Sequence, residues 1–148
     1  MRNFLEINAK MDLNYKILNG GFKPLRAHKE DAGFDLYTPE DQTIPAGGFV
    51  FIPLKVCVEV PKGYVGLLMG RSSLNRGGVN AFTGVIDAGY TGEIGVTLFN
   101  ATSENYNIRA GERIAQLVIC KIADIENLIT KPFQESERGS NGYGSTGK

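Results

Sequence analysis

Apolar and polar residues alternate along several short stretches of this chain. The longest stretch, residues 50–60, has an apolar side chain at every second position: Val50, Ile52, Leu54, Val56, Val58 and Val60. Because successive side chains of a strand point to opposite faces of a sheet, this alternation predicts a half-buried β-strand. Residues 94–98 follow the same pattern, and shorter runs that favour strands lie at 34–37, 64–69, 85–86 and 114–119.

Turn signals rich in glycine and proline separate these runs. They lie at 45–48, 61–63, 76–78, 87–89 and 109–111. Short strands between such turns are typical of an all-β sandwich, barrel or jelly roll. Only 72–76 and 124–128 leave room for a helical turn or two. With no repeat or interdomain linker visible, the 148 residues predict a single domain.

Charge and cysteine usage narrow the classes of function. Sixteen basic residues balance sixteen acidic ones, which argues against a surface devoted to nucleic acid or anionic lipid but leaves room for a local cationic pocket. No apolar run is long enough for a membrane span, and residues 1–6 lack the apolar stretch of a secretory signal, so we expect a cytoplasmic protein. Cys57 and Cys120 lie far apart and His28 is the single histidine, which argues against disulfide, zinc and Cys-His or Ser-His-Asp chemistry.

Two segments in the first half place a charged side chain beside a predicted strand or turn. In 32–36 a carboxylate, Asp35, interrupts an apolar run; it either faces solvent or helps to hold a hard cation such as Mg²⁺ through water. In 70–74, Arg71 precedes Ser72 and Ser73 at the start of a predicted helical turn. The serines either cap that turn or, together with free N–H groups and the guanidinium, bind an anion.

Two further segments hold polar groups within predicted strands and turns. Residues 84–93 are either a plain β-hairpin with Asp87 at its tip, or a rigid turn whose carboxylate polarises a water while its backbone and Tyr90 recognise a planar ring. In 111–117, Gln116 lies among apolar residues, where a buried amide must be hydrogen-bonded. It is either structural or ligand-binding.

The C-terminal residues 138–148 differ from the rest in composition. They are rich in glycine, serine and arginine, with Tyr143 as the single aromatic residue, and they cannot bury enough apolar surface to fold alone. The segment is either a frayed tail or a phosphate-binding loop that orders over a ligand. Together, the two anion-binding segments, the carboxylates and the aromatic residues fit a nucleoside triphosphate with a divalent ion.

These five segments, in this order, resemble the five motifs of the trimeric dUTP diphosphatases (dUTPases). The resemblance covers about residues 25–148, and its motifs correspond to 32–36, 70–74, 84–93, 111–117 and 138–147. It implies a jelly-roll subunit of a homotrimer, with a domain at 1–137 and a flexible arm at 138–148 that orders on ligand binding. It also implies Mg²⁺-dependent hydrolysis of dUTP to dUMP and pyrophosphate, which limits uracil incorporation into DNA and supplies dUMP for dTTP synthesis, with no nucleic-acid or membrane partner.

The resemblance further implies a role for each site residue. Asp87 would activate the water that attacks the α-phosphorus, Tyr90 would exclude a 2′-hydroxyl, and Asp35 would hold Mg²⁺ through water. Phosphate groups would be bound by the 70–74 segment, by Gln116 and by the C-terminal arm, while the 84–86 backbone reads uracil and Tyr143 stacks on it. The substrate-binding residues would be Arg71, Ser72, Ser73, Gly84, Val85, Ile86, Asp87, Tyr90, Gln116, Arg138, Tyr143, Gly144, Ser145 and Thr146.

Two details depart from the usual family pattern, and one contact stays open. Tyr143 stands where phenylalanine is common, and Gly89 stands where a second acid is frequent. An additional residue upstream of the turn sometimes contacts the base, and Asn80 and Ala81 are both candidates for it.

Two alternative functions are weighed against dUTP hydrolysis. The dCTP deaminases share the fold and two of the motifs, but their catalytic glutamate would fall at Thr97, which has no carboxylate to shuttle a proton. A nucleotide-gated regulatory binding protein would also accommodate a tail that orders on a ligand. No specific feature of the sequence favours it.

Overall fold

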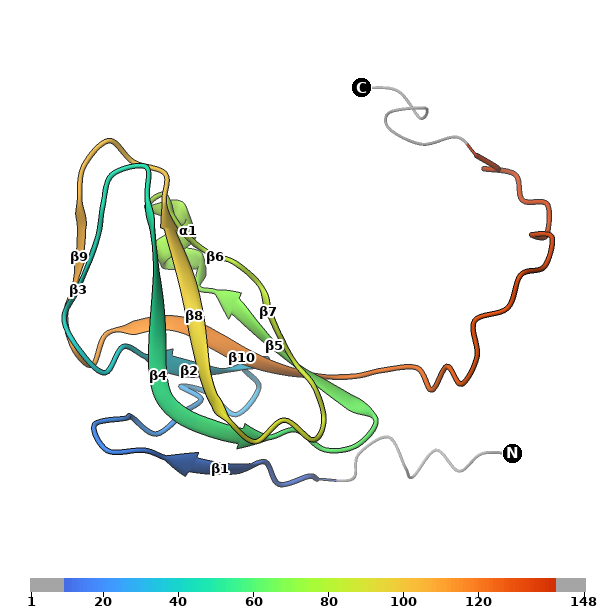
Figure 1. Ribbon diagram of the computed structural model, residues 1–148, viewed down its shortest axis with the longest axis horizontal. Helices are drawn as coiled ribbons and strands as arrows, with labels where there is room; N and C mark the ends of the chain where they lie inside the picture. The colour runs from blue at the N-terminus through green and yellow to red at the C-terminus, as the bar shows by residue number, and fades with distance from the viewer. Residues whose placement is uncertain (1–9, 141–148) are drawn as a thin grey trace.

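Almost all of the regular secondary structure is β-strand (Figure 1). The structure is a computed structural model that describes residues 10–140. Within this range the elements are β1 (Asn14–Ile17), β2 (Gly33–Tyr37), β3 (Gln42–Ile44), β4 (Phe49–Glu59), β5 (Tyr64–Gly70), α1 (Ser72–Arg76), β6 (Val79–Ala81), β7 (Gly84–Ile86), β8 (Glu93–Asn100), β9 (Tyr106–Ile108) and β10 (Arg113–Lys121). None of the described helices is long and apolar enough to cross a membrane.

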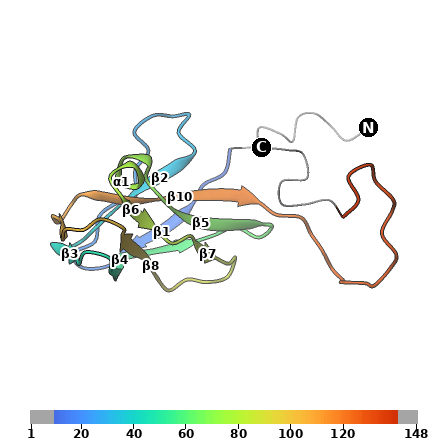
Figure 2. The same cartoon turned by 90° about the horizontal axis from the view of Figure 1, so that it is seen from above.

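The strands form two four-stranded antiparallel sheets and one two-stranded sheet. The orders are β1-β4-β8-β6, β2-β10-β5-β7 and β3-β9. Buried side chains from both large sheets belong to one apolar cluster, with Ile52 and Leu98 from the first sheet and Leu68 and Leu117 from the second. The two layers are visible edge-on in Figure 2. The all-β fold class predicted from the sequence is confirmed.

The strand predicted from the alternation at residues 50–60 is present as β4, the longest strand. In β4, Ile52, Leu54, Val56 and Val58 are buried, whereas Phe49 and Phe51 face outward. The pairing with β8 is interrupted between Pro53 and Val56, where β4 holds extra residues that have no partner on β8. This β-bulge contains Lys55, the one non-glycine residue in the described range with a positive φ (56°).

The other predicted strands are also present. Of the two segments that left room for a helical turn, 72–76 forms α1, whereas 124–128 is exposed and has no regular structure. Its apolar residues, among them Leu128 at 96% exposure, do not pack against the sheets. A short helix is stable only when its apolar face packs against another part of the protein. Residues 84–93 are not a β-hairpin, because β7 pairs with β5 in one sheet and β8 with β4 and β6 in the other.

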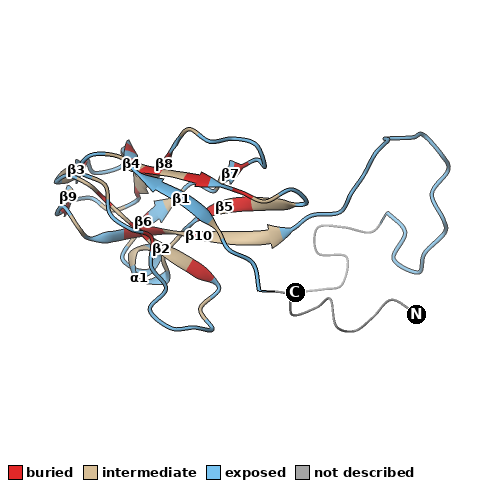
Figure 3. Cartoon of the chain, turned by 90° about the horizontal axis from the view of Figure 1, so that it is seen from below, coloured by how far each residue is buried: buried red, intermediate tan, exposed pale blue. Residues whose placement is uncertain are grey.

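The chain leaves the sheets after β10. Residues 122–140 contain no strand or helix and are exposed along their whole length (Figure 3). In Figure 1 this segment, coloured orange to red, extends away from the sheets. The division of the chain at residue 137 stays a prediction.

One buried amide, that of Asn100 at the end of β8, holds two loops together. Its Nδ2 donates to the carbonyl oxygens of Ile44 (3.1 Å) and Glu104 (2.7 Å), and its Oδ1 accepts from the backbone N–H of Thr102 (3.0 Å). Asn100 is fully buried, and its bond to Ile44 is buried whereas that to Glu104 is partly buried, so the Ile44 carbonyl above all has little access to water as an alternative donor.

We therefore predict that Asn100→Ala lowers the free energy of unfolding by about 2–4 kcal/mol, because buried carbonyl groups lose their donor. Urea unfolding at a fixed protein concentration measures the change. Asn107→Ala is the matched control: its amide accepts an exposed bond from Thr43 (2.7 Å), and its loss should change stability by about 0.5 kcal/mol or less. Equal effects of the two substitutions would contradict the role of Asn100.

Candidate active site

A carboxylate shared by two arginines forms the centre of one cavity. Asp35 on β2 lies 3.1 Å from Nε of Arg71, which follows β5, and 3.2 Å from Nη1 of Arg113 on β10. The three residues meet because β10 lies between β2 and β5 in the sheet. Each carboxylate oxygen has its own arginine, so Asp35 holds two guanidinium groups side by side.

Gln116 completes this cavity from the central strand. It pairs with Asp35 on one side and with Met69 on the other, and its Nε2 donates to the carbonyl oxygen of Gly70 (3.0 Å). The expected hydrogen bond of this amide is therefore present. A Cβ on the buried Gly33 would lie 2.7 Å from Oε1 of Gln116, so a side chain at position 33 would displace the amide.

The cavity has a volume of about 240 Å³ and carries charges of both signs. Its lining consists of Ala27, Asp31, Ala32, Gly33, Asp35, Arg71, Ser72, Arg113 and Gln116. We name it the arginine cavity. Three of the predicted phosphate-binding residues and the predicted metal-binding Asp35 thus lie together.

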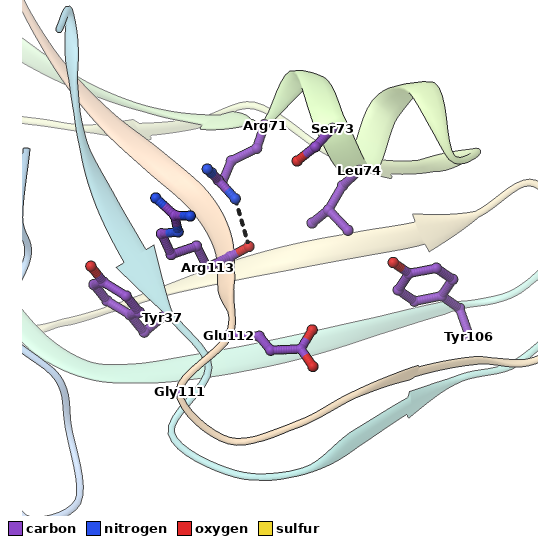
Figure 4. A pocket seen from close by; sticks show the side chains of 8 residues that line it. All are labelled: Tyr37, Arg71, Ser73, Leu74, Tyr106, Gly111, Glu112 and Arg113. Atoms are coloured by element: carbon purple, nitrogen blue, oxygen red, sulfur yellow. Dashed lines mark hydrogen bonds between the residues drawn. The ribbon is translucent and has the colours of Figure 1, made fainter. Parts of the chain in front are cut away.

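A second cavity of about 460 Å³ adjoins the first (Figure 4). Arg71 and Arg113 border both cavities, and Nη1 of Arg71 donates to the carbonyl oxygen of Arg113 (3.3 Å). Ser73, at the start of α1, lines this second cavity. No side-chain cap hydrogen bond forms at the N-terminus of α1, so the capping alternative for the two serines is not observed.

The 84–95 segment, which we name the β7–β8 corner, carries the other half of the predicted site. Asp87 is exposed at a turn in which the backbone N–H of Tyr90 donates to the carbonyl oxygen of Asp87 (3.2 Å). The left-handed φ of Gly89 (94°) completes this turn. A cavity of about 300 Å³ lies at the corner, lined by Phe51, Leu68, Gly84, Val85, Ile86, Asp87, Tyr90, Glu93, Ile94 and Gly95.

One chain does not bring these two halves together. Ile86 pairs with Gly66 on β5, whereas Arg71 follows Gly70 at the other end of that strand. Asp87 is thus level with Val65, and six residues of extended strand span about 20 Å. The corner and the arginine cavity lie at opposite ends of β5.

The remaining predicted residues are placed only in part. Arg138 lies in the exposed segment after β10, and Tyr143, Gly144, Ser145 and Thr146 lie outside the described residues. The two candidates for the additional base contact, Asn80 and Ala81, both lie on β6 beside β8.

Metal ligands are sparse in the part of the chain that the structure describes. It contains no group of three or more His, Cys, Asp or Glu side chains arranged for a metal ion. Asp35, which shares its cavity with the carboxylate of Asp31, is therefore not a member of a cage of three or more such ligands within these residues.

Arg113 is a site residue that the sequence pattern did not reveal. Strict alternation along β10 would place its side chain on the buried face with Ala115 and Leu117. A register shift between Arg113 and Ala115 instead buries both Ile114 and Ala115 and turns Arg113 to the face of Gln116 and Asp35. The signal that could have indicated this role is the position of Arg113 three residues before Gln116, the polar residue of the same strand.

These features define the class: an all-β protein with a paired-arginine cavity and a separate turn-borne carboxylate beside a tyrosine. Comparison with known proteins agrees with this class. The profile of the family dUTPase matches residues 22–147. The chain belongs to the dUTPase family, which confirms the resemblance that its motifs indicated.

Two relatives illustrate the similarity in sequence. The deoxyuridine 5′-triphosphate nucleotidohydrolase of Candida albicans is 41% identical over 131 residues, covering 86% of this chain and 82% of the relative. That of Clostridium tetani is 39% identical over 140 residues, covering 92% and 97%.

Solved structures of phage proteins share the fold. The dUTPase of Staphylococcus bacteriophage 80alpha with dUpNHpp, described as controlling the transfer of virulence genes, has a TM-score of 0.86 and 34% identity, covering 94% of this chain and all of that one. A mutant dUTPase from phage phi11 of S. aureus, described as revealing the coordination of a structural Mg(II) ion, has a TM-score of 0.78 and 29% identity, covering 83% and 99%.

The close fit of Gly33 against Gln116 yields a prediction for the arginine cavity. Gly33→Ala should displace the Gln116 amide from Gly70 and lower the free energy of unfolding by about 1–3 kcal/mol through overpacking. A crystal structure and urea unfolding test both effects. Gly77→Ala is the control, since Gly77 has a negative φ (−81°) and its nearest neighbour would lie at an ordinary 3.4 Å. An undisturbed Gln116 in the Gly33 variant would contradict the prediction.

Proposed function

We propose that this protein is a dUTP diphosphatase that hydrolyses dUTP to dUMP and pyrophosphate. The observation that carries the proposal is an accessible Asp87 beside Tyr90 at the β7–β8 corner, in a chain of the dUTPase family that also has a paired-arginine cavity. Such an activity keeps uracil out of DNA and supplies dUMP for dTTP synthesis. The cytoplasmic setting expected from the sequence stays a prediction.

The corner is suited to a pyrimidine base because β7 is an edge strand. It pairs with β5 on one side only, so alternate backbone N–H and C=O groups of Gly84–Ile86 point away from the sheet. A uracil edge offers complementary donors and acceptors. Cytosine presents an amino group where uracil has a carbonyl, which leaves buried polar groups unpaired at a cost of about 1–3 kcal/mol each.

The reaction needs no protein nucleophile. Asp87 accepts a proton from a water, the water oxygen forms a bond to the α-phosphorus, and the bond from that phosphorus to the bridging oxygen of pyrophosphate breaks. Such a transfer depends on in-line positioning and charge neutralisation. Arg71, Ser72, Ser73 and Gln116 supply the positioning, and Arg113 adds a second guanidinium beside that of Arg71.

Mg²⁺ fits this site as an ion that arrives with the triphosphate. Proteins usually bind Mg²⁺ through one or two carboxylates, with substrate phosphates and waters as the other ligands. Asp35 is one carboxylate, and its two oxygens already face two guanidinium groups, which favours contact through water. When bound, the ion neutralises phosphate charge, while Asp35 keeps Arg71 and Arg113 in place.

The geometry of β5 favours a shared active site in a homotrimer. Because Asp87 and Arg71 of one chain are separated by about 20 Å of strand, they cannot both contact one triphosphate. A corner from one chain and an arginine cavity from another can do so. The arm of the third chain would then bring Arg138 and Tyr143 over the ligand.

Exposed apolar side chains support this assembly. Phe49 and Phe51 on β4 are 67% and 60% exposed, and Leu128 and Phe133 in the segment after β10 are 96% and 99% exposed. Monomeric proteins rarely leave so much apolar surface in contact with water. Neighbouring copies of the chain would cover the face of β4 and receive the segment that follows β10.

The alternative functions have less support. In a deaminase the catalytic glutamate would stand at Thr97, which lies within β8 opposite Phe51 and has no carboxylate. A purely regulatory nucleotide-binding protein would need no water-activating acid, and Asp87 is present and accessible. Two assays separate the three functions. A diphosphatase releases pyrophosphate from dUTP, a deaminase releases ammonia from dCTP, and a purely regulatory protein does neither.

We predict that Asp87→Asn retains dUTP binding but reduces turnover by at least about 100-fold, because the amide cannot accept the proton of the attacking water. Pyrophosphate release with Mg²⁺ and calorimetric binding of a non-hydrolysable dUTP analogue measure the two effects. Asp41→Asn, which alters another exposed acid, is the control. Unchanged turnover in Asp87→Asn would remove this residue from its role, and a wild-type protein that leaves dUTP intact would overturn the function.

We also predict that a chain ending at Glu137 remains a folded trimer but loses at least about 100-fold in turnover, because the phosphate-binding arm no longer positions the substrate. Analytical ultracentrifugation should give about three times the chain mass, which is 16.1 kDa for the full protein. Removal of Lys148 alone, which lies beyond the fifth motif, is the control. A monomer would refute the shared site, and a fully active truncate would refute the arm.

A further inference from the structure

Tyr90 is held by hydrogen bonds from its backbone and from the tip of its side chain. Its backbone N–H donates to the carbonyl oxygen of Asp87 in the turn, and its hydroxyl donates to the backbone carbonyl oxygen of Glu93 (2.8 Å). Between these points the ring lies across Gly92, where an added Cβ would be 2.5 Å from the tyrosine oxygen. The orientation of the ring therefore depends on where the Glu93 carbonyl lies.

The side chain of Glu93 is bound to the bulge in β4. Its Oε1 accepts a hydrogen bond from the backbone N–H of Lys55 (2.9 Å), a group that has no partner in the ladder because the bulge interrupts the pairing with β8. The Lys55 carbonyl accepts from the N–H of Leu18 (2.8 Å), so both backbone groups of the bulged residue are satisfied. The Lys55 ammonium points elsewhere, toward Glu40 (4.0 Å).

The bulge is a strained element that needs this support. Lys55 has a left-handed φ of 56°, which side chains other than glycine rarely adopt. Such a conformation persists only when its surroundings determine it strongly. Glu93 itself pairs with Cys57 on the far side of the bulge, so its carboxylate links this end of β8 to the bulged residue as well as to the regular ladder. Without the carboxylate, the Lys55 N–H would lose its partner, and the bulge next to the Val56–Ile94 and Cys57–Glu93 pairs would be free to shift them.

We propose that Glu93 is a positioning residue for sugar selectivity, acting through Tyr90. By fixing the bulge at Lys55, its side chain holds the Glu93 backbone carbonyl, which in turn holds the Tyr90 ring against the deoxyribose of the nucleotide. A ring in this fixed place excludes a 2′-hydroxyl. The inference rests on the proposed dUTP hydrolysis and on the sugar contact of Tyr90.

The main test is the ratio of kcat/KM for dUTP to that for UTP. Glu93→Ala should lower this ratio by about 3- to 10-fold, the equivalent of one lost hydrogen bond, chiefly by improving the KM for UTP. Glu93→Gln keeps an acceptor oxygen at the same reach and should restore most of the selectivity. Asp41→Ala is the matched control, because it removes a similar carboxylate bond to a loop N–H, that of Ala110 (2.9 Å), away from the corner.

A double-mutant cycle distinguishes positioning from a general loss of stability. Tyr90→Phe removes the hydroxyl bond to Glu93 and should lower the same ratio. Because Glu93 acts through that bond, adding Glu93→Ala to Tyr90→Phe should cause little further loss. If Glu93→Ala does not fold, Glu93→Asp, whose carboxylate is one methylene too short for the Lys55 N–H, takes its place in the cycle.

Two results would overturn the inference while leaving the proposed function intact. One is a wild-type ratio in the folded Glu93→Ala or Glu93→Asp variant. The other is full additivity of the two substitutions, since independent effects would mean that Glu93 does not act through Tyr90. A wild-type protein that does not hydrolyse dUTP would instead refute the function itself.

Discussion

The antiparallel pairing of β5 with its neighbours sets the geometry on which the rest of the site depends. At one end this strand leads into Arg71 beside Asp35, and at the other end it pairs with the β7 residue that precedes Asp87. The strand keeps the paired arginines and Asp87, the proposed water-activating acid, about 20 Å apart within one chain. In the proposed function the chemistry therefore takes place between chains, and the exposed phenylalanines and the long exposed segment after β10 are consistent with that assembly.

Two interruptions of regular pairing give the site its details. The bulge in β4 creates an unpaired N–H at Lys55, which Glu93 satisfies from the β7–β8 corner. The register shift in β10 turns Arg113 to the face of Asp35. Bulges redirect side chains without ending a strand. In this protein one of them supports the β7–β8 corner, and the other adds a cation to the arginine cavity.

Much of the fold follows from hydrophobic alternation, because long half-buried strands such as 50–60 have a strong period of two. The short strands β1, β3, β6 and β9 escaped prediction, since three or four residues carry little periodic signal and their pairing depends on distant partners. The room for a helical turn at 124–128 is not used, because local propensity cannot supply a packing surface. Motif residues such as Asp35 and Gln116 were found from chemistry and order, whereas Arg113 required knowledge of a bulge.

The open edge of β7 has a consequence for the behaviour of the protein in solution. Unpaired strand edges are templates on which foreign strands can assemble into aggregates. β7 has only three residues, Gly84–Ile86, and the chain turns away at Asp87 directly afterwards. So short an edge offers little backbone for another polypeptide to pair with. In the proposed function, the same three residues would present their main chain to one pyrimidine ring.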